Sequence, residues 1–327
     1  MHLRRFALFT IMLLASACLP VGRGSTSNAG RSSPAITLIS RREYDVEQRL
    51  VLHNAGPGKP EKQNLWVALI RDLAPYQNVK SLAISPGHYV LVTDEYGNQY
   101  AEFDLSGQAA GSSEIVEIKT RVVVNELAYD LADCKGELPN EYVQPELHIE
   151  SANPQIVRLA GSLVARHSTV CENVRAFYDY VAGELTYTPN EQSWGAQAAL
   201  GPMGADCTEY ASLLTALSRA QRIPARYFEG LRYVEAEAGS GARIEHAWLD
   251  VYLPGSGWVA MDPTLGRSPL AREAYFAHYT PDHIIVTMGR NPSTLRGSSY
   301  WTHLYWPGDT AKIRVDSAEW KIKLAGG

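Results

Sequence analysis

The sequence lacks several patterns that would place a protein in a function class at once. It has no stripe of basic residues interleaved with aromatics, and its formal net charge is −5, which argues against a nucleic-acid partner. It has four cysteines among 327 residues and neither a CxxC nor an HExxH spacing, so no common zinc motif is present. It also shows no internal repeat. Hydrophobic residues make up 45% and charged residues 20%, a composition that predicts a globular fold of two domains.

Long apolar runs are also scarce, and the clearest one lies at the start of the chain. "MHLRR" precedes the run "FALFTIMLL", which is too short to span a bilayer, and "ASAC" follows it. This order predicts a signal peptide over residues 1–17. The small residues Ala15, Ser16 and Ala17 before Cys18 resemble a bacterial lipobox, in which the cysteine becomes a lipid anchor, although Ala15 stands where Leu is usual. The alternative is plain secretion with Cys18 unmodified.

The next segment is rich in glycine and serine, "LPVGRGSTSNAGRSSP". It cannot bury enough apolar area to fold, so we expect a flexible tether over residues 18–34. Sixteen residues of coil span about 20–25 Å. We therefore expect an exported protein, lipid-anchored at the outer face of a bacterial membrane or in the periplasm, that touches the membrane through this anchor.

Alternating, β-branched runs dominate the first folded region. "AITLISRREYDVEQRLVLHN" and "EIVEIKTRVVVNELAY" have a period of two, and turn-rich stretches such as "NAGPGKP" separate the runs. This pattern predicts an antiparallel β-sandwich of about seven strands over residues 35–148. "DEYGN" at residues 94–98 could suggest a calcium loop, but it lacks the later acidic ligands of that motif, so a hairpin turn is the better interpretation.

The hydrophobic period then changes to that of helices. "NPQIVRLAGSLVAR" and "STVCENVRAFYDYVAGEL" place apolar residues three and four apart, and Thr169 with Glu172 forms a possible capping box. We expect a second domain over residues 149–327 and an α+β fold for the chain. Alternating runs after residue 266, among them "HIIVTMGR" and "AKIRVDSAEWKIK", are expected to complete the sheet of this second domain.

One helix of this region begins with a cysteine. In "GADCTEYASLLTALSRAQRIP", Asp206 fits the N-cap, Glu209 falls at N3, and Pro224 ends the helix. Cys207 then occupies the first helical position. Free N–H groups and the helix dipole at that position favour negative charge, lower the pKa of a thiol and can bind an oxyanion. The alternative is that Cys207 is a small buried core residue.

A β-hairpin follows this helix and supplies the partners that a nucleophilic thiol needs. In "HAWLDVYLPGSGWVAMDPT", His246 begins one strand and Asp262 ends the other, so both lie toward the same end. A four-residue loop would pair Leu253 with Trp258 and leave Asp262 on the wrong face. We therefore expect a one-residue register shift or a bulge that moves Asp262 to the His246 face.

Together these stretches resemble the transglutaminase-like superfamily, and the resemblance covers residues 204–264. It implies a papain-like α+β core in which helices pack on an antiparallel sheet. It also implies a catalytic triad, with Cys207 as nucleophile, His246 as general base and Asp262 as the acid that orients the imidazole. A second oxyanion donor upstream of the cysteine is implied as well, for which Gln192 and Trp194 are the candidates.

The resemblance implies an enzyme that forms an acyl-thioenzyme. We expect no cofactor, and we expect the substrate to be a peptide or protein amide in the cell envelope. Water is the default acceptor, which makes hydrolysis, as in a cysteine protease or amidase, the expected reaction. The alternatives are protein-glutamine acyl transfer, which crosslinks proteins, and a non-catalytic anchored module for binding or assembly.

The remaining cysteines and histidines have simpler interpretations. Cys134 and Cys171 could form a disulfide in an oxidising compartment, or Cys171 could be a buried thiol on its helix. Zinc bound by Cys207, His246 and Asp262 is disfavoured by their spacing. Three further histidines have no evident partner and are expected to be structural or exposed: His167, His278 and His283.

Trp248 and Trp258 are expected in the core of the sheet rather than as walls of the site. For Glu209 and Asp250, helix capping and solvent exposure are expected rather than a role in tuning the triad or binding a cation.

Overall fold

A computed structural model describes residues 35–131, 134–166, 168–189, 193–235, 244–308 and 310–326. The predicted signal peptide, the tether with Cys18, His167 and Gln192 lie outside the described residues. Residues 34–327 form one compact unit. Within the described part of the chain, no helix is both long enough and apolar enough to cross a membrane.

The described residues form three α-helices and thirteen strands. The helices are α1 (Pro154–Leu163), α2 (Val170–Glu184) and α3 (Cys207–Ala220). The strands are β1 (Ile36–Asn54), β2 (Lys62–Leu69), β3 (Gln77–Ser85), β4 (Val90–Thr93), β5 (Gln99–Asp104), β6 (Ser113–Tyr129), β7 (Ala225–Arg232), β8 (Glu245–Leu253), β9 (Gly257–Met261), β10 (His278–Tyr279), β11 (His283–Met288), β12 (Trp301–Trp306) and β13 (Ile313–Leu324). This mixture of antiparallel sheets and helices is the α+β fold that the sequence predicts.

Two antiparallel sheets form the β-sandwich. One has the order β10-β6-β1-β13 with β3 also paired to β6, and the other has the order β12-β2-β5-β4. Because side chains alternate along a strand, each sheet offers one apolar face, and these faces meet in a cluster that includes Leu50, Leu65, Val67, Phe103 and Val116. Residues 94–98 form the hairpin turn between β4 and β5, as predicted.

The C-terminal strands correct one expectation. β11 pairs with β7 and so joins the sheet of the second region as predicted, whereas β12 pairs with β2 and β13 pairs with β1. The expectation that the whole tail completes the second sheet is therefore wrong for residues 301–324. A strand with an alternating pattern can pair at the edge of any sheet. Without β13, the backbone groups along one side of β1 would lack a partner strand. The domain boundary expected after residue 148 stays a prediction.

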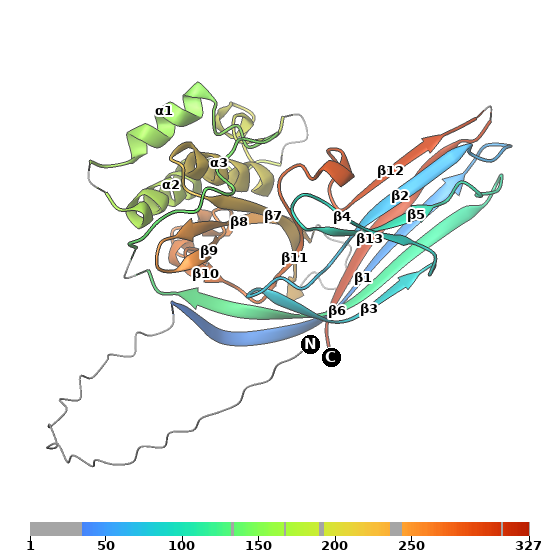
Figure 1. The fold of residues 1–327 in the computed structure, drawn as a ribbon, viewed down its shortest axis with the longest axis horizontal. Coiled ribbons are helices and arrows are strands. Elements are labelled where there is room, and N and C mark those ends of the chain that lie inside the picture. Colours follow the sequence, from blue (N-terminus) through green and yellow to red (C-terminus); the bar gives the residue numbers. More distant parts are fainter. Residues whose placement is uncertain are drawn as a thin grey trace, which may run out of the picture. The chain divides into compact units, whose positions relative to one another are not determined.

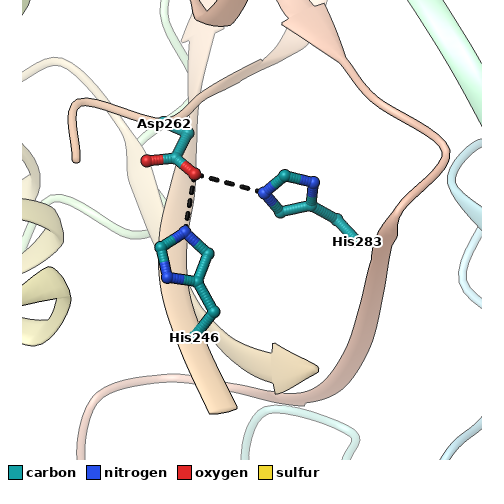
Figure 2. A group of neighbouring side chains, drawn as sticks. All are labelled: His246, Asp262 and His283. Carbon is teal, nitrogen blue, oxygen red and sulfur yellow. Dashed lines mark hydrogen bonds and ion pairs between the residues drawn. The ribbon is translucent and has the colours of Figure 1, made fainter. Parts of the chain in front are cut away.

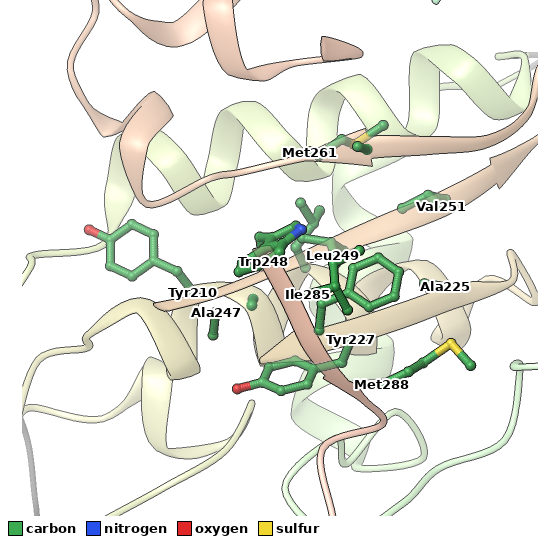
Figure 3. Packing of buried hydrophobic residues seen from close by; sticks show 14 of the residues in the cluster. Tyr210, Ala225, Tyr227, Ala247, Trp248, Leu249, Val251, Met261, Ile285 and Met288 are labelled. Carbon is green, nitrogen blue, oxygen red and sulfur yellow. The ribbon is translucent and has the colours of Figure 1, made fainter. Parts of the chain in front are cut away.

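The third sheet has the order β11-β7-β8-β9, and α3 packs against β7 and β8 (Figure 1). α1 and α2 in turn pack on α3. The contact between helix and sheet is hydrophobic: Tyr210 of α3 belongs to the same buried cluster as Tyr227, Leu249 and Ile285 of the strands (Figure 3). This packing fixes the first turn of α3 over the sheet, which positions the residues described next.

Local sequence signals account for the ends of the helices. Asp206 caps α3 by accepting from Thr208 N at 2.8 Å, and Glu209 Oε2 accepts from Asp206 N at 3.2 Å, which completes the predicted capping box. Thr169 and Glu172 form the same arrangement at α2, again as predicted. Each capping box satisfies N–H groups that would otherwise lack partners at the start of a helix.

Candidate active site

Cys207 is the first residue of α3 and lines a cavity of about 560 Å³. His246 lines the same cavity, and Cys207 is a free, partly buried thiol. The sulfur is therefore reachable from a space large enough for part of a substrate. This placement is the geometry that a nucleophile requires, and it differs from that of a sealed core thiol.

The β8–β9 hairpin brings His246 and Asp262 together. Leu253 pairs with Gly257, and Leu249 pairs with Met261, so the loop has one residue fewer than the simplest four-residue loop. The predicted one-residue register shift is thus confirmed, and Asp262, which directly follows β9, falls on the His246 side. His246 Nε2 lies 2.6 Å from Asp262 Oδ2 (Figure 2).

The environment of His246 favours its charged form. Burial acts to lower the pKa of His246, but the nearby Asp262 carboxylate and a hydrogen bond with Cys207 outweigh it and raise the pKa to about 9. Because Nε2 is engaged with Asp262, Nδ1 is the ring nitrogen left to face the sulfur. The result is an imidazolium beside a thiol, which is the arrangement that supports a thiolate nucleophile.

Asp262 is buried and has three polar neighbours. Oδ2 lies 2.6 Å from His246 Nε2 and 3.1 Å from His283 Nε2, and Oδ1 accepts from Leu265 N at 2.9 Å. Burial acts to raise the pKa of this carboxyl, but the two histidines hold it well below its usual range. Asp262 is therefore a carboxylate that two imidazole rings share.

His283 is the participant that sequence reasoning missed. It was expected to have no partner and to be either structural or exposed; it is 2% exposed and contacts Asp262 directly, so the expectation of no partner is wrong. His283 comes from β11, and nothing in the local sequence says that this strand pairs with β7 and so reaches the hairpin. The acidic residue directly before it, Asp282, was the one available signal of a charged partner.

The structure gives less support to the upstream oxyanion candidates. Trp194 is 51% exposed, its ring packs edge-on against His148, and it is not among the described residues that line the cavity. Gln192 lies outside the described residues. The oxyanion role of both residues stays a prediction.

Several other residues receive a definite place. Cys134 and Cys171 form a disulfide, with Cα atoms 6.0 Å apart. Trp248 is buried in the core, as expected, and its ring also stacks on His246 with centroids 5.9 Å apart. Asp250 was expected to face solvent, but it is fully buried and ion-paired with Arg226, because its strand is covered on both faces.

Glu209 has a second contact besides its cap. Its Oε1 accepts from Gly195 N at 3.3 Å and from Thr208 Oγ1 at 2.8 Å. Burial, with a smaller effect of Asp206, raises the pKa of Glu209 to about 7. Glu209 thus ties the loop that carries Trp194 to the start of α3.

One group of side chains among the described residues has a spacing that a metal ion could use. The ligand atoms of His246, Asp262 and His283 lie within 4.8 Å of one another. Both Nε2 atoms, however, approach the same carboxylate oxygen at hydrogen-bond distance. Hydrogen bonding therefore accounts for the arrangement without a metal.

Comparison with known proteins places this site in a family. Residues 157–263 match the family model of the transglutaminase-like superfamily. These residues are a transglutaminase-like core. The matched segment contains Cys207, His246 and Asp262, whereas His283 lies beyond its end. The match thus includes the three residues that the sequence predicts as a triad and excludes His283.

Individual relatives are distant. The chain is 28% identical over 166 residues to the uncharacterized protein YebA of Bacillus subtilis (strain 168). The match covers 45% of this chain and 21% of YebA. The chain thus spans about a fifth of the length of that relative.

Among solved structures, a proposed cysteine protease from Cytophaga hutchinsonii matches with a TM-score of 0.62 and 14% identity. The match covers 89% of this chain and 93% of that one, and it shows that the two share a fold well beyond the transglutaminase-like core. The periplasmic domain of TgpA from Pseudomonas aeruginosa matches with a TM-score of 0.36 and 15% identity, over 74% of this chain and 91% of that one.

Proposed function

We propose that the protein is a cell-envelope thiol hydrolase that cleaves peptide or protein amide bonds through an acyl-thioenzyme on Cys207. The observation that carries this proposal is the meeting of a free thiol at a helix N-terminus with a His246–Asp262 pair at one cavity. These are the three roles that acyl transfer by a thiol requires: a nucleophile, a proton carrier and an acid that orients it.

In the acylation step, which starts from the thiolate of Cys207 beside protonated His246, the sulfur attacks the carbonyl carbon of the substrate amide and forms a C–S bond. The amide C–N bond then breaks, and the proton on His246 Nδ1 passes to the leaving amine. The acyl group remains on the sulfur as a thioester. Asp262 is hydrogen-bonded to Nε2 and so keeps the ring in the orientation that points Nδ1 at the sulfur.

In the deacylation step, His246 is neutral and takes a proton from a water molecule at the thioester. The resulting oxygen nucleophile attacks the carbonyl, the C–S bond breaks, and the acid product leaves. The sulfur regains its negative charge and His246 keeps the proton, which restores the starting state. If an amine attacked instead of water, the product would be a new amide, as in acyl transfer.

The start of α3 supplies a donor for the oxyanion. The N–H groups of Thr208 and Glu209 donate to the capping carboxylate of Asp206. We therefore assign the N–H of Cys207 itself as the donor that binds the oxyanion. The helix dipole adds to this donor. A second donor from the loop with Trp194 is part of the same proposal, because Glu209 ties that loop to the helix start.

The envelope location rests on the sequence of the first 34 residues. A signal peptide, a lipobox-like cysteine and a flexible tether favour an exported protein held at a membrane through Cys18. The disulfide between Cys134 and Cys171 agrees with an oxidising compartment.

Peptide profiling with the purified protein tests the proposal. A diverse peptide library is incubated with the protein in water alone and with added glycine ethyl ester, and the products are identified by mass spectrometry. We expect cleaved peptides with free acids from the wild type and none from Cys207→Ala. His278→Ala, which changes a histidine outside the cavity, is the matched control and should cleave normally.

The other outcomes identify the alternatives. Products joined to the amine, without cleavage in water, would replace hydrolysis by acyl transfer. Peptide binding without any new product, equal in the wild type and in Cys207→Ala, would replace the enzyme by a binding module.

A further inference from the structure

Asp262 does not end the series of polar side chains that starts at Cys207. His283 Nε2 lies 3.1 Å from the same Asp262 oxygen that contacts His246 (Figure 2). The other ring nitrogen, Nδ1, lies 3.0 Å from Asp282 Oδ1 and 2.8 Å from Thr280 Oγ1. The ring therefore stands between two carboxylates, one of which belongs to the proposed triad.

We propose that His283 is a positioning residue, whose Nε2–H holds Asp262 in the orientation that His246 needs while its Nδ1–H is anchored by Asp282. The inference rests on the proposed function, and it extends the proposed triad to a chain of five side chains. His283 is not among the described residues that line the cavity, and its hydrogen bond to the site goes to Asp262.

The packing around His283 fixes the ring in one place. Its side chain is 3% exposed, and the ring meets Trp248 edge-on with centroids 4.8 Å apart. The same Trp248 ring stacks on His246, so one indole holds both histidines. Tyr279 Oη donates to the His283 carbonyl at 2.7 Å and fixes the start of β11. A ring confined in this way can direct a carboxylate, whereas a mobile one could not.

The geometry also indicates the charge on His283. Two ring nitrogens that both face carboxylate oxygens can both donate only if the ring is an imidazolium. The pKa of His283 agrees: burial acts to lower it, but Asp282 and Asp262 outweigh burial and raise it to about 9. Asp262 therefore stands between two imidazolium rings in the neutral pH range.

The titratable groups that contact this ring are Asp262 after β9, His246 on β8, Asp282 before β11 and Tyr279 on β10. Arg232 on β7 pairs with Asp282, and Tyr275 on the short helix before β10 interacts with both carboxylates. Burial acts to raise the pKa of Asp282, but His283, with smaller effects of Thr280 and of Arg232 at 3.1 Å, holds it well below its usual range. Loss of the His283 charge should therefore act on both carboxylates and, through Asp262, on His246.

Two substitutions separate the hydrogen bond from the charge. In His283→Gln, the amide nitrogen replaces Nε2 and can still donate to Asp262, but the positive charge is gone. In His283→Phe, both the donor and the charge are gone, while the ring volume is kept. His278→Gln is the matched control, because His278 contacts Glu126 and the Ala274 carbonyl rather than Asp262.

We expect kcat to fall at least about 10-fold in His283→Phe and to stay within about 3-fold of the wild type in His283→Gln. We also expect the alkaline limb of the pH–rate profile to move up by about one unit in both variants, because the loss of a neighbouring positive charge raises the pKa of His246. His278→Gln should change neither quantity. A merely structural role would lower kcat and the melting temperature of both variants together and leave the alkaline limb in place, which would overturn the proposal.

A measurement on the wild type removes any dependence on how the variants fold. The ring ¹⁵N shifts of His283 at pH 7 should report two protonated nitrogens, and a neutral ring would overturn the proposal. Failure of the proposed function has a different signature, since the wild type itself would then show no turnover. If the proposed function holds but this inference is wrong, the wild type will be active, and His283→Phe will have the same kcat and pH profile as the wild type.

Discussion

At the scale of single residues, the site depends on a thiol whose environment differs from that of a core cysteine. Cys207 lies at the start of α3, lines a cavity and faces a histidine that is held by a carboxylate. Sequence reasoning placed these three residues because each sits at a recognisable point: a helix start, a strand start and a strand end. It could not place His283, whose role depends on which strand pairs with β7.

Replacement of the sulfur tests the role of Cys207. Cys207→Ser is nearly isosteric, so we expect turnover to fall at least about 10³-fold while the melting temperature stays close to that of the wild type. Kinetics and thermal unfolding on the same preparation check this expectation. A large drop in melting temperature with part of the activity retained would mean that the thiol is mainly a packing residue.

The titration of His246 sets the pH range of the enzyme. Its pKa of about 9 lies above the ordinary value of 6.5, so the protonated ring stabilises the folded protein. This stabilisation is full below pH 6.5 and is lost as the pH rises through about 9. We expect kcat/KM and the free energy of unfolding both to decline toward pH 9. A rate that keeps rising above pH 10 would contradict this assignment.

At the scale of elements, the first turn of α3 and the register of the β8–β9 hairpin position the site. The hairpin register could be anticipated in kind, since Asp262 can reach the His246 face only if the simplest loop is changed by one residue. The observed pairing of Leu253 with Gly257 makes that change. Its exact form could not be derived, because several loops of three to five residues are compatible with "PGSG".

The cap of α3 gives a test at this scale. Asp206→Ala removes the side chain that accepts from Thr208 N, and we expect the free energy of unfolding to fall by about 1 kcal/mol. Asp206→Asn keeps an acceptor at the N-cap and should lose much less. Chemical denaturation of both variants measures the difference. Equal losses in the two variants would show that the carboxylate charge, rather than the cap, stabilises the helix start.

At the scale of the whole molecule, a buried polar network joins the β-rich region to the third sheet. Tyr76 Oη donates to Asp250 Oδ2 at 2.7 Å, and Arg226 donates to both oxygens of Asp250. The Arg226 guanidinium also lies 3.9 Å from the centre of the Trp258 ring. Sequence reasoning could not find this network, because Tyr76 and Asp250 are 174 residues apart. For the same reason the partners of β12 and β13 were assigned wrongly.

The loss in the free energy of unfolding should depend on which residue of this network is replaced. Asp250→Ala leaves the Arg226 charge buried without its partner, so we expect a loss of about 3–5 kcal/mol in the free energy of unfolding. Tyr76→Phe removes one hydrogen bond to a charged group and should cost about 1.5–3 kcal/mol. Urea unfolding of the two single variants checks the order. A larger loss in Tyr76→Phe than in Asp250→Ala would contradict this account of the network.

Covalent labelling of the folded protein with a thiol-reactive acyl probe tests the central claim most directly. We expect peptide mapping by mass spectrometry to show an acyl group on Cys207 of the wild type, none at residue 207 of Cys207→Ala and far less on Cys207 of His246→Ala. Equal labelling of all three proteins would mean that the sulfur and the imidazole do not act together, and the proposed enzyme would be wrong.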